Sequence, residues 1–319
     1  MPVIQTHSLR KDYGSVQALA GVTLSVEKGQ IYGLLGQNGA GKTTLIKILL
    51  GIVRKTSGEA LLLDSAAGTT EVRRRVGYLP EDHQFPGYHT GYSLMEFYGQ
   101  LYGVSRVQRR RKIPETLELV GIAGRMHSKI KTYSKGMKQR LGIAQALMHK
   151  PELIFLDEPT DGVDPLGRRE IRTLMARLKE QGHTIFLNSH LLGEVELICD
   201  RVAIVQQGKL VREGTIAELT EQKGLFELRL ATGQAFPAEQ LREAGFAVKQ
   251  AGEVWEISLK EGQNIDPVLK LIVEAGLGLR HLVEKKVSLE EVFMATVEKT
   301  EQASDRQGVK VIPVGGSDR

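Results

Sequence analysis

The chain has 319 residues, of which 41% are hydrophobic and 25% are charged, a composition typical of an ordinary globular protein with a sizeable core and roughly two domains. The formal net charge of +5 suits a surface near anionic lipid or nucleic acid, but it argues for neither by itself. The single cysteine, Cys199, excludes an internal disulfide bond and suits a reducing cytosol. We see no signal peptide and no apolar run of about 20 residues, so we expect no membrane-spanning segment.

The first part of the chain is predicted to form strands and one helix. Residues 3–30 alternate apolar and polar positions, which is typical of half-exposed antiparallel strands. The short apolar run Ile31–Leu35 predicts a buried parallel strand, and Thr43–Leu50 predicts a helix that ends at Gly51. The residues between this strand and this helix therefore lie at the carboxyl end of a strand, where ligands bind in open parallel sheets.

This connecting loop matches the phosphate-binding pattern G-x-x-x-x-G-K-[ST]. Its glycines let backbone N–H groups close around phosphate oxygens, where a Cβ atom would collide. Lys42 can reach the β- and γ-phosphates, and the Thr43 hydroxyl can ligate Mg²⁺. The sequence therefore predicts a nucleoside triphosphate and Mg²⁺ as ligands. The residues of the loop are Gly36, Gln37, Asn38, Gly39, Ala40, Gly41, Lys42, Thr43 and Thr44.

Residues 82–150 differ in character and predict a mainly helical insert. They are rich in aromatic residues at their start, carry the basic run Arg109–Lys112 and show apolar residues at helical spacing. Near the end of the insert, Ser134 can cap the amphipathic helix that follows it. The free N–H groups at such a helix start, beside Gly136, could also bind an anion, but taken alone the capping role is the simpler interpretation.

Two further strand ends carry polar groups that complement the phosphate loop. The buried strand Leu153–Leu156 runs directly into Asp157 and Glu158. Asp157 can complete the shell of Mg²⁺, usually through water, and Glu158 can orient or deprotonate the attacking water. After the next buried strand, Thr184–Leu187, His190 can donate a hydrogen bond to the γ-phosphate. A lone histidine at a strand end is more often structural, but beside the other two strand ends the functional interpretation is favoured.

The alternation of strands and helices through residues 151–215 predicts a doubly wound, parallel α/β sheet, and a second unit follows it. Residues 225–298 are predicted to form a small α+β module with the ferredoxin-like order β-α-β-β-α-β. The capping box Ser288–Glu291 predicts a last helix through Val297. Residues 300–319 are polar and rich in glycine, which predicts a disordered tail.

Over residues 1–220, the order of these motifs resembles the nucleotide-binding subunit of ATP-binding-cassette (ABC) transporters. The resemblance implies a P-loop NTPase cassette with an antiparallel β subdomain and the helical insert, with ATP and Mg²⁺ as ligands. It also implies that the ring of Tyr13 stacks on adenine. The run Tyr133–Met137 is similar to the signature loop of that family, in which Ser134 and Gly136 receive a phosphate.

The chain departs from the family pattern in two places. Lys135 and Met137 replace residues of a signature that often reads Leu-Ser-Gly-Gly-Gln. The family also has a glutamine after the strand that resembles Val76–Leu79, and Glu81 stands there in this chain, where it can still bind Mg²⁺ or water. The run Ser288–Phe293 resembles the branch of the family whose partners export drugs, antibiotics, lipids or polymers.

The resemblance also implies partners. Two nucleotide-binding subunits would pack head to tail, with each ATP between the phosphate loop of one chain and the Ser134 loop of the other, and we expect a homodimer. The ATPase would be cytoplasmic and held on the inner face of the cell membrane by a separate integral-membrane permease, docked on the aromatic segment 83–102.

Two alternatives stay open at this point. One is a non-transport ABC protein that acts on ribosomes or nucleic acid, and the other is a regulatory ATP-binding module without turnover. We expect no nucleic-acid partner, because the run 109–112 is the one hint of it and such runs are usually solvated helix faces. The presence of both Glu158 and His190 argues against a module without turnover.

Overall fold

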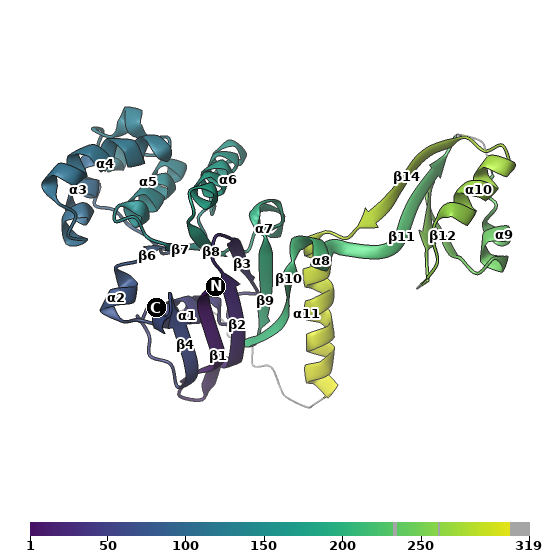
Figure 1. The fold of residues 1–319 in the computed structure, drawn as a ribbon, viewed down its shortest axis with the longest axis horizontal. Coiled ribbons are helices and arrows are strands. Elements are labelled where there is room, and N and C mark those ends of the chain that lie inside the picture. Colours follow the sequence, from purple (N-terminus) through teal and green to yellow (C-terminus); the bar gives the residue numbers. More distant parts are fainter. Residues whose placement is uncertain (232–234, 261, 307–319) are drawn as a thin grey trace, which may run out of the picture. The chain divides into compact units, whose positions relative to one another are not determined.

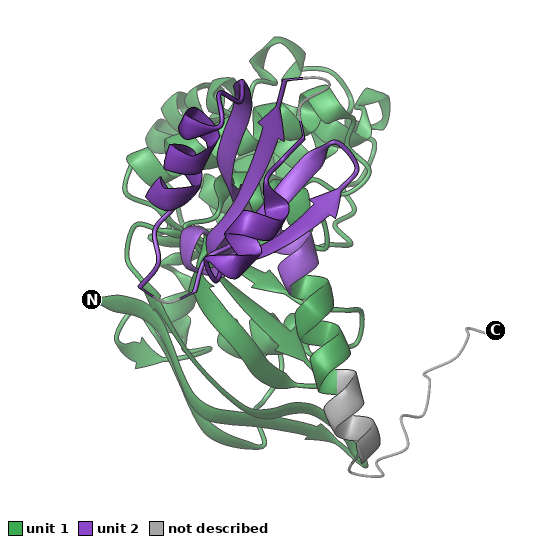
Figure 2. Cartoon of the chain, turned by 90° about the vertical axis from the view of Figure 1, so that its right-hand side faces the viewer, with its two compact units in different colours: residues 1–216, 293–319 green, residues 217–292 purple. Residues whose placement is uncertain are grey.

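A computed structural model of the protein describes residues 1–231, 235–260 and 262–306. The chain forms two compact units (Figure 1, Figure 2). Unit 1 comprises residues 1–216 and 293–319, and unit 2 comprises residues 217–292. No helix in the described ranges is both long enough and apolar enough to cross a membrane.

The first sheet of unit 1 is antiparallel and contains the N-terminal strands. Its strands have the order β2-β1-β4-β5. Burial alternates along them, as the alternating sequence predicts: in β2, Val22, Leu24 and Val26 are buried and the residues between them are exposed. The bounds are β1 (Pro2–Tyr13), β2 (Val16–Glu27), β4 (Ser57–Leu62) and β5 (Ser65–Ala66).

The second sheet of unit 1 has six strands in the order β10-β9-β3-β8-β7-β6. All neighbours are parallel except β9 and β10, which form a hairpin through Gln207 and Gly208, both with positive φ (48° and 73°). Every residue of β3, β7 and β8 is buried, which explains their continuous apolar runs. The predicted α/β fold with an antiparallel β subdomain is confirmed. The bounds are β3 (Ile31–Leu35), β6 (Val76–Leu79), β7 (Leu153–Asp157), β8 (Thr184–Asn188), β9 (Arg201–Gln206) and β10 (Lys209–Thr215).

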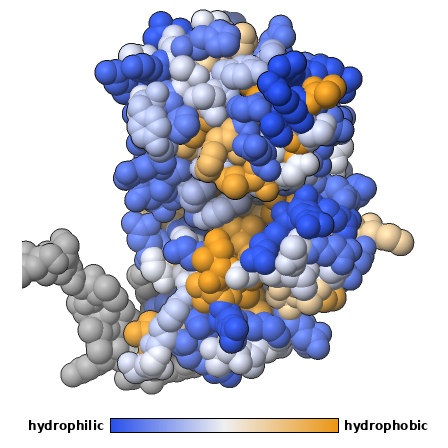
Figure 3. Space-filling view, turned by 90° about the vertical axis from the view of Figure 1, so that its left-hand side faces the viewer, coloured by the Kyte–Doolittle hydropathy of each residue, from blue (hydrophilic) through white to orange (hydrophobic). Residues whose placement is uncertain are grey.

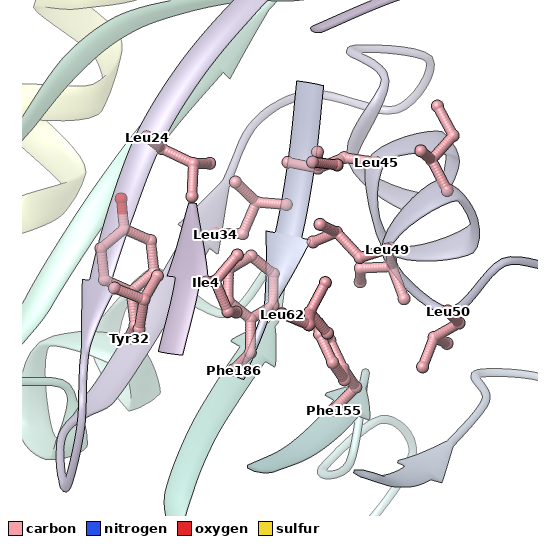
Figure 4. Close-up of a cluster of buried hydrophobic side chains, with 14 of the residues drawn as sticks. Ile4, Leu24, Tyr32, Leu34, Leu45, Leu49, Leu50, Leu62, Phe155 and Phe186 are labelled. Atoms are coloured by element: carbon pink, nitrogen blue, oxygen red, sulfur yellow. The ribbon is translucent and has the colours of Figure 1, made fainter. Parts of the chain in front are cut away.

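One hydrophobic core joins the two sheets of unit 1. Figure 4 shows Leu45 and Leu49 of α1 pointing toward Leu34 of the parallel sheet and toward Ile4 and Leu62 of the antiparallel sheet. This core holds the helix that follows the phosphate loop in a fixed position against both sheets. The helices of unit 1 outside the insert are α1 (Lys42–Leu49), α2 (Thr70–Arg73), α6 (Pro165–Glu180) and α7 (Leu192–Ile198).

The insert is helical, and its helices start at polar caps. Thr90, Ser105 and Ser134 each accept a hydrogen bond from a backbone N–H of the first turn. The cap role predicted for Ser134 is therefore present in the structure. The bounds are α3 (Gly91–Leu101), α4 (Arg106–Leu119), the 3₁₀ turns η1 (Ala123–Arg125) and η2 (Ile130–Thr132), and α5 (Lys135–Leu147).

The basic run 109–112 is only partly a solvated helix face. Arg109 is buried between α3 and α4, where it pairs with Glu96 at 2.9 Å and donates a hydrogen bond to the carbonyl oxygen of Val104. The reason is geometric, because Arg109 lies on the side of α4 that faces α3, and its long apolar stem packs there. This arginine belongs to the packing of the insert and is not available to nucleic acid.

Unit 2 is a four-stranded antiparallel sheet with the order β12-β13-β11-β14 and two helices. This is the strand order of a ferredoxin-like module. Leu228, Ile257, Val268 and Ile272 lie in its own core. The bounds are β11 (Glu221–Leu230), α9 (Ala238–Glu243), β12 (Ala247–Ala251), β13 (Val254–Ser258), α10 (Asp266–Glu274) and β14 (Leu279–Lys286).

Two helices connect the units, α8 (Ile216–Thr220) and α11 (Leu289–Arg306). The structure corrects the expected end of α11, which continues beyond Val297 to Arg306, so the first residues of the predicted tail are helical. Good helix formers such as glutamate, glutamine and alanine follow Val297, and the Thr300 hydroxyl donates to the Thr296 carbonyl, so nothing stops the helix there. The rest of the predicted tail, 307–319, lies outside the described residues.

Candidate nucleotide-binding site

The polar strand ends meet because β3, β8 and β7 are neighbours in the sheet. In the parallel register, Leu34 is opposite Asn188, and Asn188 is opposite Asp157. These ends open into a pocket of about 400 Å³. The pocket is lined by the phosphate loop, the start of β2 and the ends of the neighbouring strands: Val16, Gln17, Ala18, Asn38, Gly39, Ala40, Gly41, Lys42, Thr43, Thr44, Glu81, Glu158, Asn188 and His190.

The phosphate loop depends on glycine at its tightest points. Gly39 and Gly41 have φ values of 80° and 104°, a region that favours glycine. A Cβ atom at Gly36 would lie 2.3 Å from the carbonyl oxygen of Val205, so only glycine fits there. Gly41 is also the residue before α1 and provides no side-chain cap, which leaves the N–H groups of the first turn of α1 free for phosphate oxygens.

Lys42 is held inside the loop. Its Nζ atom donates hydrogen bonds to the carbonyl oxygens of Gly36 at 2.6 Å and Gln37 at 3.1 Å. Burial lowers the pKa of Lys42, and the negative charges of Glu158, Asp157 and Glu81 oppose that shift. The cation therefore sits among acids at the base of the pocket, where an anionic phosphate can replace carbonyl oxygens as its partner.

The acids of the site are close enough to influence one another. Burial raises the pKa of Asp157, the hydrogen bond from Asn188 lowers it, and the charges of Glu81 and Glu158 raise it again. Asp157 is buried and is not part of the pocket wall, whereas Glu81 and Glu158 are. Such crowding of carboxylates is unfavourable without a cation, and Lys42 supplies only one positive charge.

Glu158 and His190 form a direct pair at the edge of the pocket. His190 Nδ1 lies 2.9 Å from Glu158 Oε2, and the backbone N–H of His190 donates to the same oxygen at 3.3 Å. Glu158 has a φ of 52°, and its own N–H donates to the carbonyl oxygen of Asn188 at 2.9 Å. These contacts leave the other carboxylate oxygen, Oε1, as the one that can face a water molecule.

Six of the residues that the sequence analysis selects do not line the pocket. Gly36 and Gln37 accept hydrogen bonds from Lys42, and Asp157 accepts one from Asn188, so these three contact residues of the pocket wall. The other three are Tyr13, Ser134 and Gly136. Tyr13 is 46% exposed, and Lys11 Nζ lies 4.5 Å from the centre of its ring. The part of the pocket wall that comes from the N-terminal strands is formed by residues 16–18 instead. Ser134 and Gly136 do not line the pocket either. The Ser134 hydroxyl accepts a hydrogen bond from the backbone of Met137 at 3.2 Å at the start of α5.

Residues 16–18 and Asn188 line the pocket but were not selected from the sequence. Two unselected residues, Asn188 and Gln139, form hydrogen bonds with the acids of the site. Asn188 lines the pocket and contacts both Asp157 and Glu158. Gln139 of α5 donates a hydrogen bond to the carbonyl oxygen of Glu158 at 3.4 Å. The position of Asn188, at the carboxyl end of a buried strand and two residues before His190, was a signal that could have identified it. Gln139 carried no such signal, because its partner is on a distant segment.

Comparisons with known proteins agree with this geometry. The model of the family described as "ABC transporter" matches residues 19–161. The bacitracin transport ATP-binding protein BcrA of Bacillus licheniformis is 36% identical over 303 residues, which cover 92% of this chain and 97% of that protein. The linearmycin resistance ATP-binding protein LnrL of Bacillus subtilis (strain 168) is 37% identical over 224 residues, which cover 70% of this chain and 72% of that protein.

A solved structure supports the same assignment. The protein cbiO1 from Clostridium perfringens, part of the ABC transporter complex cbiONQ, superposes with a TM-score of 0.63 at 27% identity over 68% of this chain and 90% of that chain. The match in sequence extends along nearly the whole of BcrA, and residues of the phosphate loop line one pocket together with Glu81, Glu158 and His190. The chain therefore belongs to the family of ABC transporter ATP-binding proteins.

Proposed function

We propose that this chain is the ATP-hydrolysing subunit that powers a separate membrane permease, and that the permease is an exporter. The observation that carries ATP hydrolysis is the Glu158–His190 pair at 2.9 Å, in the same pocket as the phosphate loop. A regulatory module that only binds ATP needs no base beside the γ-phosphate, so this pair favours an enzyme.

In the proposed reaction, the N–H groups of the loop and Lys42 bind the β- and γ-phosphates. Glu158 Oε1 accepts a proton from the attacking water, whose oxygen bonds to the γ-phosphorus. The bond from that phosphorus to the bridging oxygen breaks, and the products are ADP and inorganic phosphate. His190 keeps the carboxylate in place through Oε2, which its Nδ1 and backbone N–H both contact.

The proposal includes Mg²⁺, and the residues present fit it. Thr43, Glu81 and Asp157 offer oxygen ligands, which Mg²⁺ prefers, either directly or through water. Among the residues that the structure describes, no group of three or more His, Cys, Asp or Glu side chains is arranged to hold a metal ion alone. This suits an ion that is bound by few side chains and by the phosphates themselves. When bound, Mg²⁺ would neutralise charge that develops on the phosphates.

We also propose a head-to-tail homodimer that closes around two ATP molecules. Ser134 and Gly136 lie outside the chain's own pocket, so in this proposal they contact ATP bound to the phosphate loop of the partner subunit. The N-terminus of α5 offers N–H groups for that phosphate. Tyr13 would stack on the adenine, close to the pocket wall at residues 16–18. Hydrolysis would then reopen the dimer.

The proposed docking surface for the permease is the start of the insert. Here, large apolar side chains are exposed to solvent, among them Tyr88 at 73% and Leu101 at 65%. Figure 3 views the side of the molecule on which α3 and α4 lie in Figure 1; the largest apolar area of this face lies near its middle, and the upper part is mostly hydrophilic with scattered apolar side chains. The exposed residues of this surface are Tyr88, Phe97, Leu101 and Tyr102. Such a patch is typical of a protein interface.

The proposed location follows from the docking: the chain would lie in the cytoplasm, held on the inner face of the cell membrane by the permease. The relatives named for bacitracin transport and linearmycin resistance support an exporter of this kind. The buried Arg109–Glu96 pair weakens the alternative of a nucleic-acid partner, since it removes one charge from the basic run.

The experiment that tests the proposal is an affinity purification of the tagged chain from gently solubilised native membranes. We expect one multi-span membrane protein to co-purify with the wild type, and to be lost in the double variant Phe97→Asp, Leu101→Asp. Ile52→Asp is the control, because Ile52 is similarly exposed in unit 1 but outside the insert. Recovery of ribosomes or nucleic acid without a permease would contradict the transport assignment.

A further inference from the structure

Asn188, the last residue of β8, contacts both acids of the site. Its Nδ2 atom donates a hydrogen bond to Asp157 Oδ1 at 2.5 Å, and its backbone carbonyl oxygen accepts one from the N–H of Glu158 at 2.9 Å. The residue is only 2% exposed, and it lines the pocket. Any residue in β8 could supply the backbone contact, but only a side chain with a donor can hold Asp157.

The other end of the same amide is unpaired. Asn188 Oδ1 is buried, and it has no hydrogen-bond partner in the part of the chain that the structure describes. Chemistry decides which end of the amide is the oxygen. A carboxylate only accepts hydrogen bonds, so the amide atom that contacts Asp157 must be the NH₂ group of Asn188. A buried acceptor without a partner lowers the stability of the fold by about 1–3 kcal/mol, so a donor that binds to Asn188 Oδ1 would remove this penalty.

We infer that Asn188 is a positioning residue for the Mg²⁺ shell: its Nδ2–H group holds one oxygen of Asp157, and its Oδ1 accepts a hydrogen bond from a water molecule bound to the ion. This inference rests on the proposed ATPase function. It assigns to one side chain the two tasks that a polar group behind a metal ligand performs, which are to orient the ligand and to orient the coordinated water.

Gln139 provides a matched control. It is also buried, it donates a hydrogen bond to the Glu158 carbonyl oxygen, and its own oxygen Oε1 is likewise unpaired among the described residues. It differs from Asn188 in that it neither lines the pocket nor contacts Asp157. Replacing each amide by leucine therefore separates a general effect of losing a buried amide from an effect on Mg²⁺.

The test measures binding of a fluorescent ATP analogue to the full chain, first in EDTA and then across a Mg²⁺ titration. For Asn188→Leu we expect the Mg²⁺ midpoint to rise by about 10-fold, the lower end of the effect seen for groups behind metal ligands. The affinity in EDTA should stay that of the wild type. For Gln139→Leu, the Mg²⁺ midpoint should be unchanged.

A folded Asn188→Leu protein with the wild-type Mg²⁺ midpoint overturns the inference, and so does a loss of affinity that is equal in EDTA and in Mg²⁺. Where thermal melting shows that this variant does not fold, Asn188→Ser replaces it. Serine keeps a smaller donor and acceptor, so we expect an intermediate midpoint, and an unchanged one overturns the inference as well. A wild type whose affinity does not respond to Mg²⁺ contradicts the proposed function itself.

Discussion

Glu158 is held in a backbone conformation that few residues other than glycine adopt. Its φ of 52° costs about 1–3 kcal/mol, so contacts around it have to maintain it. The carbonyl oxygen of Asn188 accepts from its N–H, Gln139 donates to its carbonyl, and His190 contacts its carboxylate. A residue that is fixed at its N–H group, its carbonyl group and one carboxylate oxygen in this way is suited to hold the other carboxylate oxygen toward a water molecule.

Replacing Glu158, the proposed base, tests its proposed role at the residue scale. In Glu158→Gln, kcat for ATP hydrolysis should fall by about 10²–10⁴-fold, because the amide cannot take the proton of the attacking water. ATP affinity should remain, since the phosphate loop and Lys42 are untouched. Phosphate release at saturating ATP measures the first quantity, and equilibrium binding measures the second.

The control for this variant is Glu152→Gln, just before the opposite end of β7, where Glu152 pairs with Arg75 at 2.7 Å and lies outside the pocket. Its turnover should match that of the wild type. Wild-type turnover in Glu158→Gln would show that another group is the base.

At the element scale, the end of α5 is joined to the parallel sheet through His149. Its Nε2 atom contacts the carbonyl oxygen of Val76 in β6 at 3.0 Å, and its ring lies 4.2 Å from that of Tyr102 in the insert. Its Nδ1 atom is buried without a partner among the described residues, as suits a neutral ring that donates through Nε2. Burial lowers the pKa of His149 from the ordinary value of 6.5, and the nearby Lys112 lowers it further, whereas the contact with Val76 opposes the shift.

This pKa shift predicts a pH dependence of stability. Because the folded pKa lies below the unfolded one, the stabilisation is complete above about pH 6.5 and is lost as the pH falls through the folded pKa. In His149→Gln, which keeps a donor for Val76, the free energy of unfolding should fall less steeply with acidification. The difference is limited to about 1.4 kcal/mol per pH unit, the value for one proton.

Urea unfolding between pH 7 and pH 5 measures this slope. His7→Gln, which removes an exposed histidine of β1, is the control and should retain the wild-type slope. Equal slopes in the wild type and in His149→Gln would contradict the prediction. His83, whose pKa burial also lowers, is expected to contribute to the acid sensitivity that remains in the variant.

The elements themselves were largely predictable, and the exceptions have local causes. The buried strands and the helix after the phosphate loop follow from contiguous patterns, so the ends of β3, β7, β8 and α1 lie within one residue of where the sequence predicts them. The predicted length of α11 was wrong, because no stop signal follows Val297 and helix-forming residues continue to Arg306. The burial of Arg109 was missed because it depends on how α3 and α4 pack.

At the scale of the whole molecule, each unit has a core of its own, and the chain's single tryptophan, Trp255, lies in unit 2. Ile257→Ala truncates a side chain in the core of unit 2. We therefore expect it to lower the free energy of unfolding, measured by tryptophan fluorescence in urea, by about 2–5 kcal/mol. ATP affinity, which reports on unit 1, should not change.

The reciprocal variant is Leu49→Ala, which truncates a fully buried side chain of α1 in the core of unit 1. It should weaken ATP binding and leave the fluorescence transition of Trp255 in place. A single transition that both variants shift equally would show that the two units unfold together, and would contradict the prediction.

The sequence by itself determined the fold class, the phosphate loop and the acid pair Asp157–Glu158 at the end of β7, because each is encoded by residues that are adjacent in the chain. Only the tertiary structure decided that His190 contacts Glu158, that Asn188 holds Asp157 and that Gln139 reaches the Glu158 carbonyl. These pairs join segments far apart in sequence, and their meeting depends on the register of β7 against β8 and on the packing of α5 against the sheet. Register and packing are properties of the whole hydrophobic core, and no local pattern encodes them.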